Sequence, residues 1–305
     1  MENFKFFIDK YLNSLISNID KTKIPKEIDL CFDGGGINGI YGWGIAKYIL
    51  FLEVNNLTKI KRISGASSGA IIALLFILNI DDIDFNNFFM KFKKNYTKNK
   101  NLIYIKTFLK KIIYSSFEKN DNMNKVNNRL FIRYFDKKKN MYVIVSKFKN
   151  RKHLYNSIIN SCYIPYLFDG NSIYKDRYRD GLMCPIFDYT IRPVLFIRLL
   201  TYKKFTKCFN LKCEQNIYNR FFTGISDANN FFIEGSSEMC LYLNSYLNLK
   251  LKLEFLIRNL IFNFINNKIA CLIECYKSIS NDLKVESINN LLSLYKNHIF
   301  DYIIN

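Results

Sequence analysis

The sequence predicts an α/β fold built on a mostly parallel sheet. Two short runs, residues 27–32 and 59–64, have the length and the apolar or alternating pattern of strands. Each is followed by a glycine-containing turn and then by a helix-like segment, at residues 37–53 and 67–78. This repeated order is typical of parallel strands joined by crossover helices. The 305 residues are 49% hydrophobic and 23% charged, which is the composition of a folded globular protein.

The remaining elements follow from residue periodicity. Residues 4–19 place apolar side chains at helical spacing, so we expect an amphipathic helix before the first strand. Further along we expect basic helices over 85–135, a strand at 141–146, a helix at 153–165, an extended piece ending at 178–182, a strand at 192–200 and mainly helical structure beyond 213. The predicted parts are an N-terminal helix (1–27), a core (28–200) and a helical part packed on that core (201–305).

One C-terminal stretch is apolar enough to raise the question of a membrane span. Residues 249–270 contain five charged residues, whereas a spanning helix needs about 20 mostly apolar residues. The pattern suits an amphipathic helix that packs on the protein or lies on a membrane. We expect packing on the protein and no transmembrane helix.

The N-terminus and the cysteines indicate a reducing compartment. The first residues are charged throughout and lack the long apolar centre of an export signal, so we expect a cytoplasmic protein that is peripheral at membranes. The eight cysteines form no C-x-x-C pair, which argues against a zinc site. We expect no metal and no other cofactor.

The net charge of +19 is concentrated in one segment. Residues 91–153 hold 19 Lys and Arg residues against three acidic residues, a net charge of +16. Such a field attracts anionic partners, either phospholipid surfaces or nucleic acid. A solvated surface that reflects a Lys-rich composition is the alternative, and charge alone does not separate the two.

Six of the 12 glycines follow the first strand within eleven residues. Glycine lets a backbone turn sharply and approach a ligand. Gly34-Gly35-Gly36 can therefore turn several amides toward one point, as an oxyanion hole requires. The alternative is a dinucleotide fingerprint, because G-x-G-x-x-G ends at Gly39 and Glu53 lies where a ribose-binding acid is found. That alternative leaves the next motif unexplained.

The next motif, Gly65-Ala66-Ser67-Ser68-Gly69, fits G-x-S-x-G between a strand and a helix. A nucleophilic serine needs such a strained turn to expose its hydroxyl, so Ser67 is the candidate nucleophile. A plain turn before a buried helix is the alternative interpretation.

A nucleophilic serine also needs a base, and the chain has two histidines. His153 lies in a basic stretch before a helix, where a solvated or capping role is expected. His298 would complete the Ser…Asp…His order of an α/β-hydrolase, but that fold places more strands before its serine. A buried aspartate with a raised pKa can act instead, if it lies within hydrogen-bond reach of the hydroxyl.

Three stretches, in this order, resemble the patatin-like phospholipase family. DGGGING (33–39) resembles its oxyanion loop D-G-G-G-x-R-G, and residues 65–69 resemble its nucleophile elbow. SCYIPYLF (161–168) resembles its A-S-x-A-x-P-x-x-F segment, and Asp180-Gly181 resembles the D-G-[GA] that carries the catalytic aspartate. The resemblance covers about residues 28–190.

The resemblance implies a three-layer α/β/α fold with a central, mostly parallel sheet and a mainly helical C-terminal part. It implies a Ser–Asp dyad without histidine, with Ser67 as nucleophile and Asp180 as base. The amides of Gly34, Gly35 and Gly36 would form the oxyanion hole. The implied activity is hydrolysis of acyl esters of phospholipids or related lipids, without a metal.

A membrane surface then becomes the expected partner of the basic segment 91–152, and nucleic acid is not expected. Two residues depart from the family pattern: Asn38 stands at its Arg or Lys position, and Leu182 replaces the small residue after Asp-Gly. Asp169 and Asp176 are competitors for the base. The other hypotheses are an esterase with a Ser-Asp-His triad and a weakly catalytic protein that binds lipid or nucleic acid.

Overall fold

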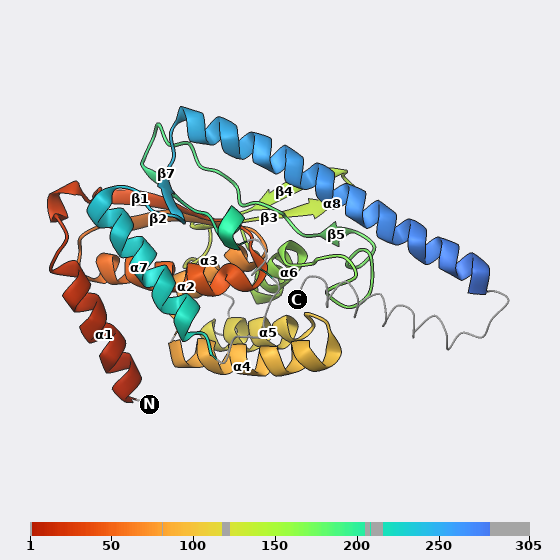
Figure 1. Ribbon diagram of the computed structural model, residues 1–305, viewed down its shortest axis with the longest axis horizontal. Coiled ribbons are helices and arrows are strands. Elements are labelled where there is room, and N and C mark those ends of the chain that lie inside the picture. The colour runs from red at the N-terminus through yellow and green to blue at the C-terminus, as the bar shows by residue number, and fades with distance from the viewer. Residues whose placement is uncertain (1, 81, 118–122, 205–207, 209–215, 281–305) are drawn as a thin grey trace.

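The centre of the molecule is a seven-stranded mixed sheet (Figure 1). The computed structural model describes residues 2–80, 82–117, 123–204, 208 and 216–280. The strand order is β4-β3-β2-β1-β6-β7, with β5 paired to β3, and the neighbours β3, β2, β1 and β6 run parallel. The strands are β1 Glu27–Phe32, β2 Lys59–Gly65, β3 Leu130–Asp136, β4 Met141–Val145, β5 Tyr178–Arg179, β6 Val194–Ile197 and β7 Cys240–Tyr242.

Helices cover both faces of this sheet, which confirms the three-layer α/β/α expectation (Figure 1). Helices α1 to α7 contribute to a large core on one face, and α8 crosses the other face. The helices are α1 Glu2–Ile16, α2 Gly39–Val54, α3 Ser68–Leu78, α4 Asp82–Asn99, α5 Tyr104–Ser116, α6 Arg151–Ser161, α7 Tyr218–Glu234 and α8 Ser245–Ser280, with 3-10 turns η1 Lys21–Lys23, η2 Gly36–Asn38 and η3 Tyr202–Lys204.

The hydrophobic core has two parts, because the side chains of each strand alternate between the two faces of the sheet. In β1, Leu30 and Phe32 face the large core, whereas Cys31 faces a smaller cluster on the other side of the sheet. Successive side chains of a strand point to opposite faces, so both faces of β1 need an apolar cover. The smaller cluster gets its cover from residues 183–187 and from the first turns of α8.

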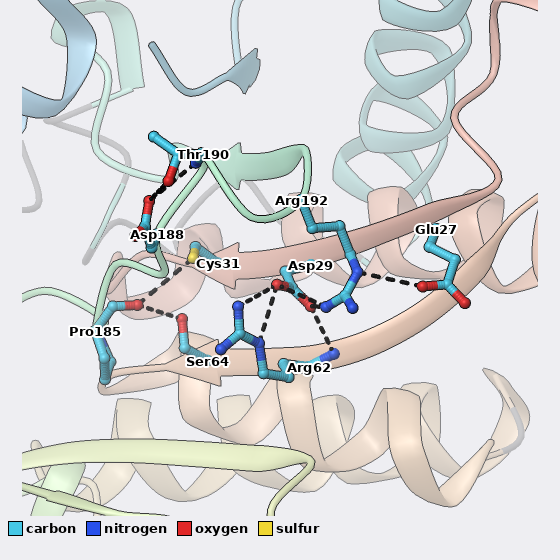
Figure 2. Close-up of polar contacts among 9 residues, drawn as sticks. All are labelled: Glu27, Asp29, Cys31, Arg62, Ser64, Pro185, Asp188, Thr190 and Arg192. Atoms are coloured by element: carbon cyan, nitrogen blue, oxygen red, sulfur yellow. Dashed lines mark hydrogen bonds and ion pairs between the residues drawn. The ribbon is translucent and has the colours of Figure 1, made fainter. Parts of the chain in front are cut away.

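A buried ion cluster holds β1 against its neighbours (Figure 2). The Asp29 carboxylate is fully buried and accepts hydrogen bonds from the guanidinium groups of Arg62 and Arg192. The shortest of these, from Arg62 Nη2 to Asp29 Oδ2, is 2.6 Å. A buried carboxylate is tolerated because it is paired and hydrogen-bonded in this way. The cluster therefore joins β1, β2 and the segment before β6.

A second set of contacts fixes the chain that follows Asp180. The Pro185 carbonyl accepts hydrogen bonds from the Ser64 hydroxyl in β2 and from the Cys31 thiol in β1 (Figure 2). The segment after Asp180 therefore lies across the two strands whose ends carry the glycine run and Ser67.

The expected elements agree with the structure at most positions, with one error in type. Residues 130–135 lie in the stretch that the sequence predicts to be helical, but they form most of β3, whose residues alternate between buried and partly exposed. The dinucleotide-binding interpretation is also wrong about Glu53, the proposed ribose-binding acid, because this residue lies inside α2. Its carboxylate accepts from the Ile60 amide and pairs with Arg129.

One of the six clustered glycines, Gly44, serves helix packing together with Gly224 of α7. A Cβ atom at Gly44 would lie 2.0 Å from the Phe221 carbonyl oxygen in α7, and one at Gly224 would lie 2.1 Å from the Tyr41 carbonyl oxygen in α2. Only glycine permits helices α2 and α7 to approach this closely. Gly44 is therefore a packing residue.

Helix α8 corrects the expectation that the apolar residues of 249–270 pack on the protein. Leu253, Ile257, Leu260 and Phe264 are each more than half exposed, whereas the Arg258 side chain, which pairs with Asp33 after β1, is only 19% exposed. Within the described part of the chain, no helix combines the length and the apolar content that a membrane span needs.

Candidate functional site

The glycine run and Ser67 meet at one edge of the sheet. Strands β1 and β2 are parallel neighbours, and Phe32 at the end of β1 pairs with Gly65 at the end of β2. The loops that follow both strands therefore start side by side, at the carboxyl edge where α/β proteins place their sites. A Cβ atom at Gly34 would lie 3.4 Å from the Ser67 Cβ atom.

Ser67 occupies a strained turn directly before α3. Its backbone has φ 52° and ψ −130°, a conformation that side-chain-bearing residues rarely adopt and that costs roughly 1–3 kcal/mol. The flanking glycines make the turn possible, because a Cβ atom at Gly69 would lie 2.2 Å from the Phe32 carbonyl oxygen. The G-x-S-x-G pattern thus has a steric cause here.

Asp180 lies just after β5, and its carboxylate is buried. One oxygen, Oδ1, accepts a hydrogen bond of 2.7 Å from the Leu182 amide. The other, Oδ2, is buried and accepts no hydrogen bond from the described residues within ordinary bonding geometry. Burial raises the pKa of Asp180 to about 7, and the neighbouring Asp33 charge adds to the rise.

The Ser67 hydroxyl is close enough to lower the pKa of Asp180, as the Leu182 amide also does. The serine and the carboxylate are therefore neighbours, without a short hydrogen bond between them. Hydrogen bonds between catalytic groups are often long before substrate binds. A carboxylate with a pKa near neutrality is suited to accept a proton from a hydroxyl.

Residues 161–163 hold both groups. The Ser161 hydroxyl accepts from the Ser67 amide at 3.0 Å, and the Cys162 thiol donates to the Ser67 carbonyl at 3.2 Å. The Tyr163 carbonyl accepts from the Asp180 amide at 2.8 Å. The SCYIP stretch at the end of α6 thus fixes the distance between the serine turn and the aspartate.

The three amides of the glycine run differ in availability. The Gly34 amide donates to the Asp33 carboxylate at 2.9 Å, and the Gly35 amide donates to the Ser68 hydroxyl at 3.1 Å. The Gly36 amide has no acceptor among the described residues, and Gly36 has φ 55°. Gly36 also lines the cavity beside Ser67.

An apolar cavity of about 90 Å³ opens beside Ser67. Its lining comes from the glycine run, from α3 and from the aromatic side of α4, and includes Gly36, Ile72, Phe88, Phe92, Ile105 and Cys162. A narrow, apolar space next to a hydroxyl fits a hydrocarbon chain better than a charged group.

Two arginines at the site were missed in the sequence. Arg258 of α8 donates to both oxygens of the buried Asp33, at 3.0 and 2.8 Å. Arg220 of α7 donates to the Asn38 side-chain oxygen at 3.0 Å, so a guanidinium adjoins the position where the family has its own cation. No local pattern could reveal them, because they lie 225 and 182 residues away from their partners.

The competing residues lie in other surroundings. His153 lies in the first turn of α6, where its amide donates to the Asn150 cap and its ring accepts from the Lys149 amide, so the capping expectation is confirmed. Asp169 pairs with Tyr163 and Lys106, and Asp176 is exposed. His298 lies outside the described residues.

In the described part of the chain, no group of His, Cys, Asp and Glu side chains could hold a metal ion. Six cysteines whose side chains the structure describes are free thiols: Cys31, Cys162, Cys184, Cys208, Cys240 and Cys271.

A glycine loop and a strained serine turn at adjoining strand ends define an α/β protein with a site at the carboxyl edge of its sheet. A sequence model of the patatin-like phospholipase family matches residues 30–187, just over half of the chain. The chain therefore belongs to the patatin-like phospholipase family, a family of lipid acyl hydrolases. No curated protein matches the chain in sequence.

Proposed function

We propose that this protein hydrolyses acyl esters of phospholipids or related lipids, with Ser67 as nucleophile and Asp180 as general base. The observation that carries the proposal is the pairing of a strained serine with a buried carboxylate whose pKa is about 7. At neutral pH a substantial fraction of that carboxylate is ionised, and the ionised form can accept a proton.

In the first step the Ser67 Oγ atom attacks the acyl carbonyl carbon while its proton passes to Asp180. The carbonyl oxygen becomes an oxyanion, and the departing alcohol then takes the proton from Asp180. In the second step Asp180 takes a proton from water while the resulting hydroxide attacks the acyl-serine. The bond from the acyl carbon to Ser67 Oγ then breaks, Asp180 returns the proton to Oγ, and the fatty acid is released. The apolar cavity beside Ser67 would hold the acyl chain.

The glycine run is the proposed oxyanion hole, and the Gly36 amide has the strongest support because it has no acceptor among the described residues. The amides of Gly34 and Gly35 would join only after Asp33 and Ser68 release them. Each donor aimed at the oxyanion lowers the barrier by about 3 kcal/mol.

The proposed partner is an anionic membrane surface, to which the basic segment 91–152 adds long-range attraction. Its lysines and arginines are distributed over α4, α5 and the β3–β4 hairpin, so they act as a general field. The salt dependence of vesicle binding measures this contribution, and affinity should fall as ionic strength rises.

The test is fatty-acid release from phospholipid vesicles, together with hydrolysis of a soluble short-chain ester and labelling by a fluorophosphonate. Ser67→Ala should lose the label and at least about a thousandfold of the activity. Asp180→Asn should lose about a hundredfold or more, and parental activity should rise with pH through about 7.

The matched control is Asp176→Asn, which changes an exposed aspartate four residues away and should leave activity unchanged. Circular dichroism shows whether each variant is folded. Parental activity in either folded site variant would refute the proposed dyad.

A further inference from the structure

The first turns of α8 cover the smaller apolar cluster, but its central turns present a row of apolar side chains outward. Among the described residues, 20 large hydrophobic side chains are exposed, and ten of them lie on this helix. We define its outer face by the central six, which are all more than half exposed: Leu253, Leu256, Ile257, Leu260, Ile261 and Phe264. A contiguous exposed patch of this kind marks an interaction site.

The inner side of α8 is fixed by polar contacts, so the outer face cannot turn inward without breaking them. Arg258 donates to the buried Asp33, and the Glu254 carboxylate accepts from Arg198. The Asn259 side-chain oxygen accepts from the Tyr142 hydroxyl at 2.8 Å. The orientation of the helix is therefore a property of the fold.

Two exposed lysines bracket the outer face. Lys250 and Lys268 are 18 residues apart, which is five helical turns, so they lie on one line along α8 about 27 Å apart. Leu253, Ile257 and Ile261 lie close to this line, between the two lysines. The Lys268 ammonium is 5.5 Å from the centre of the Phe264 ring.

We propose that the outer face of α8 is the surface that docks on an anionic phospholipid bilayer. A helix lying in the plane of the bilayer inserts apolar side chains at the acyl boundary, and its lysines reach anionic headgroups. The proposal rests on the proposed function only for the choice of lipid as the partner. The contact surface lies on the α8 side of the sheet, opposite to α4 and α5 of the basic segment, and is separate from the general attraction of that segment (Figure 1).

A second copy of the chain fits this face less well. If two α8 helices paired antiparallel about the centre of the outer face, Lys250 of one copy would face Lys268 of the other. If they paired parallel, each lysine would face its own equivalent. Both arrangements place like charges opposite each other, which disfavours pairing, whereas an anionic surface neutralises both lysines.

The experiment measures sedimentation with vesicles of phosphatidylcholine alone or mixed with phosphatidylserine. Full-length protein carrying Ser67→Ala is used, so that the vesicles stay intact. Ile257→Gln combined with Leu260→Gln should weaken binding to the mixed vesicles by at least about tenfold. Lys250→Glu combined with Lys268→Glu should reduce the preference for phosphatidylserine, and the remaining preference would come from the basic segment.

The matched control is Ile191→Gln, which makes the same change at a residue that is 70% exposed and belongs to the segment before β6. It should bind vesicles like the parent. The double glutamine change is also made in the protein with Ser67, where hydrolysis of a soluble ester should be unchanged. Absence of ester hydrolysis in the parent would count against the proposed function, while the vesicle measurement still tests the docking face.

Two outcomes would overturn the docking proposal. One is equal vesicle binding by the parent and the double glutamine variant. The other is a parent dimer in light scattering that the glutamine variant loses while its vesicle binding stays the same. That result would assign the outer face to contacts between copies of this chain.

Discussion

Asp33 and Asp180 are both buried at the site, but they differ in the groups that contact their carboxylate oxygens. Asp33 is compensated, because Arg258 contacts both of its oxygens and the Gly34 amide donates to one. Asp180 has the Leu182 amide on one oxygen and no such partner on the other. Burial raises the pKa of both carboxyls, but only at Asp33 does a guanidinium oppose the rise. The difference separates a carboxylate that holds structure from one that is free to take a proton.

The same contrast extends to the backbone. The Asp33 side of the site is held by α8 through Arg258, whereas the Asp180 side includes the strained Ser67 turn. Strain and uncompensated groups cluster where chemistry occurs, and the rest of the fold supplies the stability. Removing the cation that pairs with Asp33 should therefore destabilise the protein. Removing the buried charge of Asp180 or the backbone strain at Ser67 should stabilise it.

The largest expected effect is on the compensated side. Arg258→Met leaves Asp33 buried without its guanidinium, which should lower the free energy of unfolding by about 3–5 kcal/mol. Urea unfolding of the parent and the variant measures this. Adding Asp33→Asn to Arg258→Met should recover most of the lost free energy of unfolding, since no unpaired charge then remains. Lys268→Met, at an exposed position of the same helix, is the control and should change little. An unchanged midpoint for Arg258→Met would contradict the compensation at Asp33.

The second effect is an increase in the free energy of unfolding, and its size depends on pH. A carboxyl whose pKa rises on folding contributes stability below its unfolded pKa and loses it as pH rises through the folded value. For Asp180 that loss lies between about pH 4 and about pH 7. Asp180→Asn removes the loss, so it should be about 3–4 kcal/mol more stable than the parent at about pH 8 and nearly equal at about pH 4. Urea unfolding across this range measures it. Asp176→Asn, at an exposed aspartate four residues away, is the control and should not reproduce this gain.

The smallest effect isolates backbone strain. Ser67→Gly and Ser67→Ala both remove the hydroxyl, but only glycine adopts φ 52° and ψ −130° without strain. Ser67→Gly should therefore be about 1 kcal/mol more stable than Ser67→Ala in thermal unfolding. If Ser67→Ala is the more stable variant, the turn is not strained. Gly235→Ala gives the comparison at another left-handed position, where φ is 79° and nothing crowds a Cβ atom.

Local patterns predicted the strand ends that carry the site. The apolar run before Asp33 and the alternating run before Ser67 became β1 and β2, because their periodicity reflects burial on a sheet. The segment that became β3 was expected to be helical, since its lysine-rich surroundings masked an alternation that spans only seven residues. The roles of Ser67, Asp180 and the Gly34–Gly36 run remain proposals that the variants above test.

The sequence alone determined the order of the strands and helices other than β3 up to β6, the steric need for glycine around Ser67 and the position of an aspartate after the SCYIP stretch. These are local properties, set by side-chain periodicity and by the backbone freedom of glycine. Only the tertiary structure decided that Arg258 compensates Asp33, that Arg220 contacts Asn38 and that α8 turns its apolar side outward. The physical reason is that charge pairing and burial depend on distances between residues far apart in the chain, and helical periodicity shows that a helix has two sides without showing which side meets the protein.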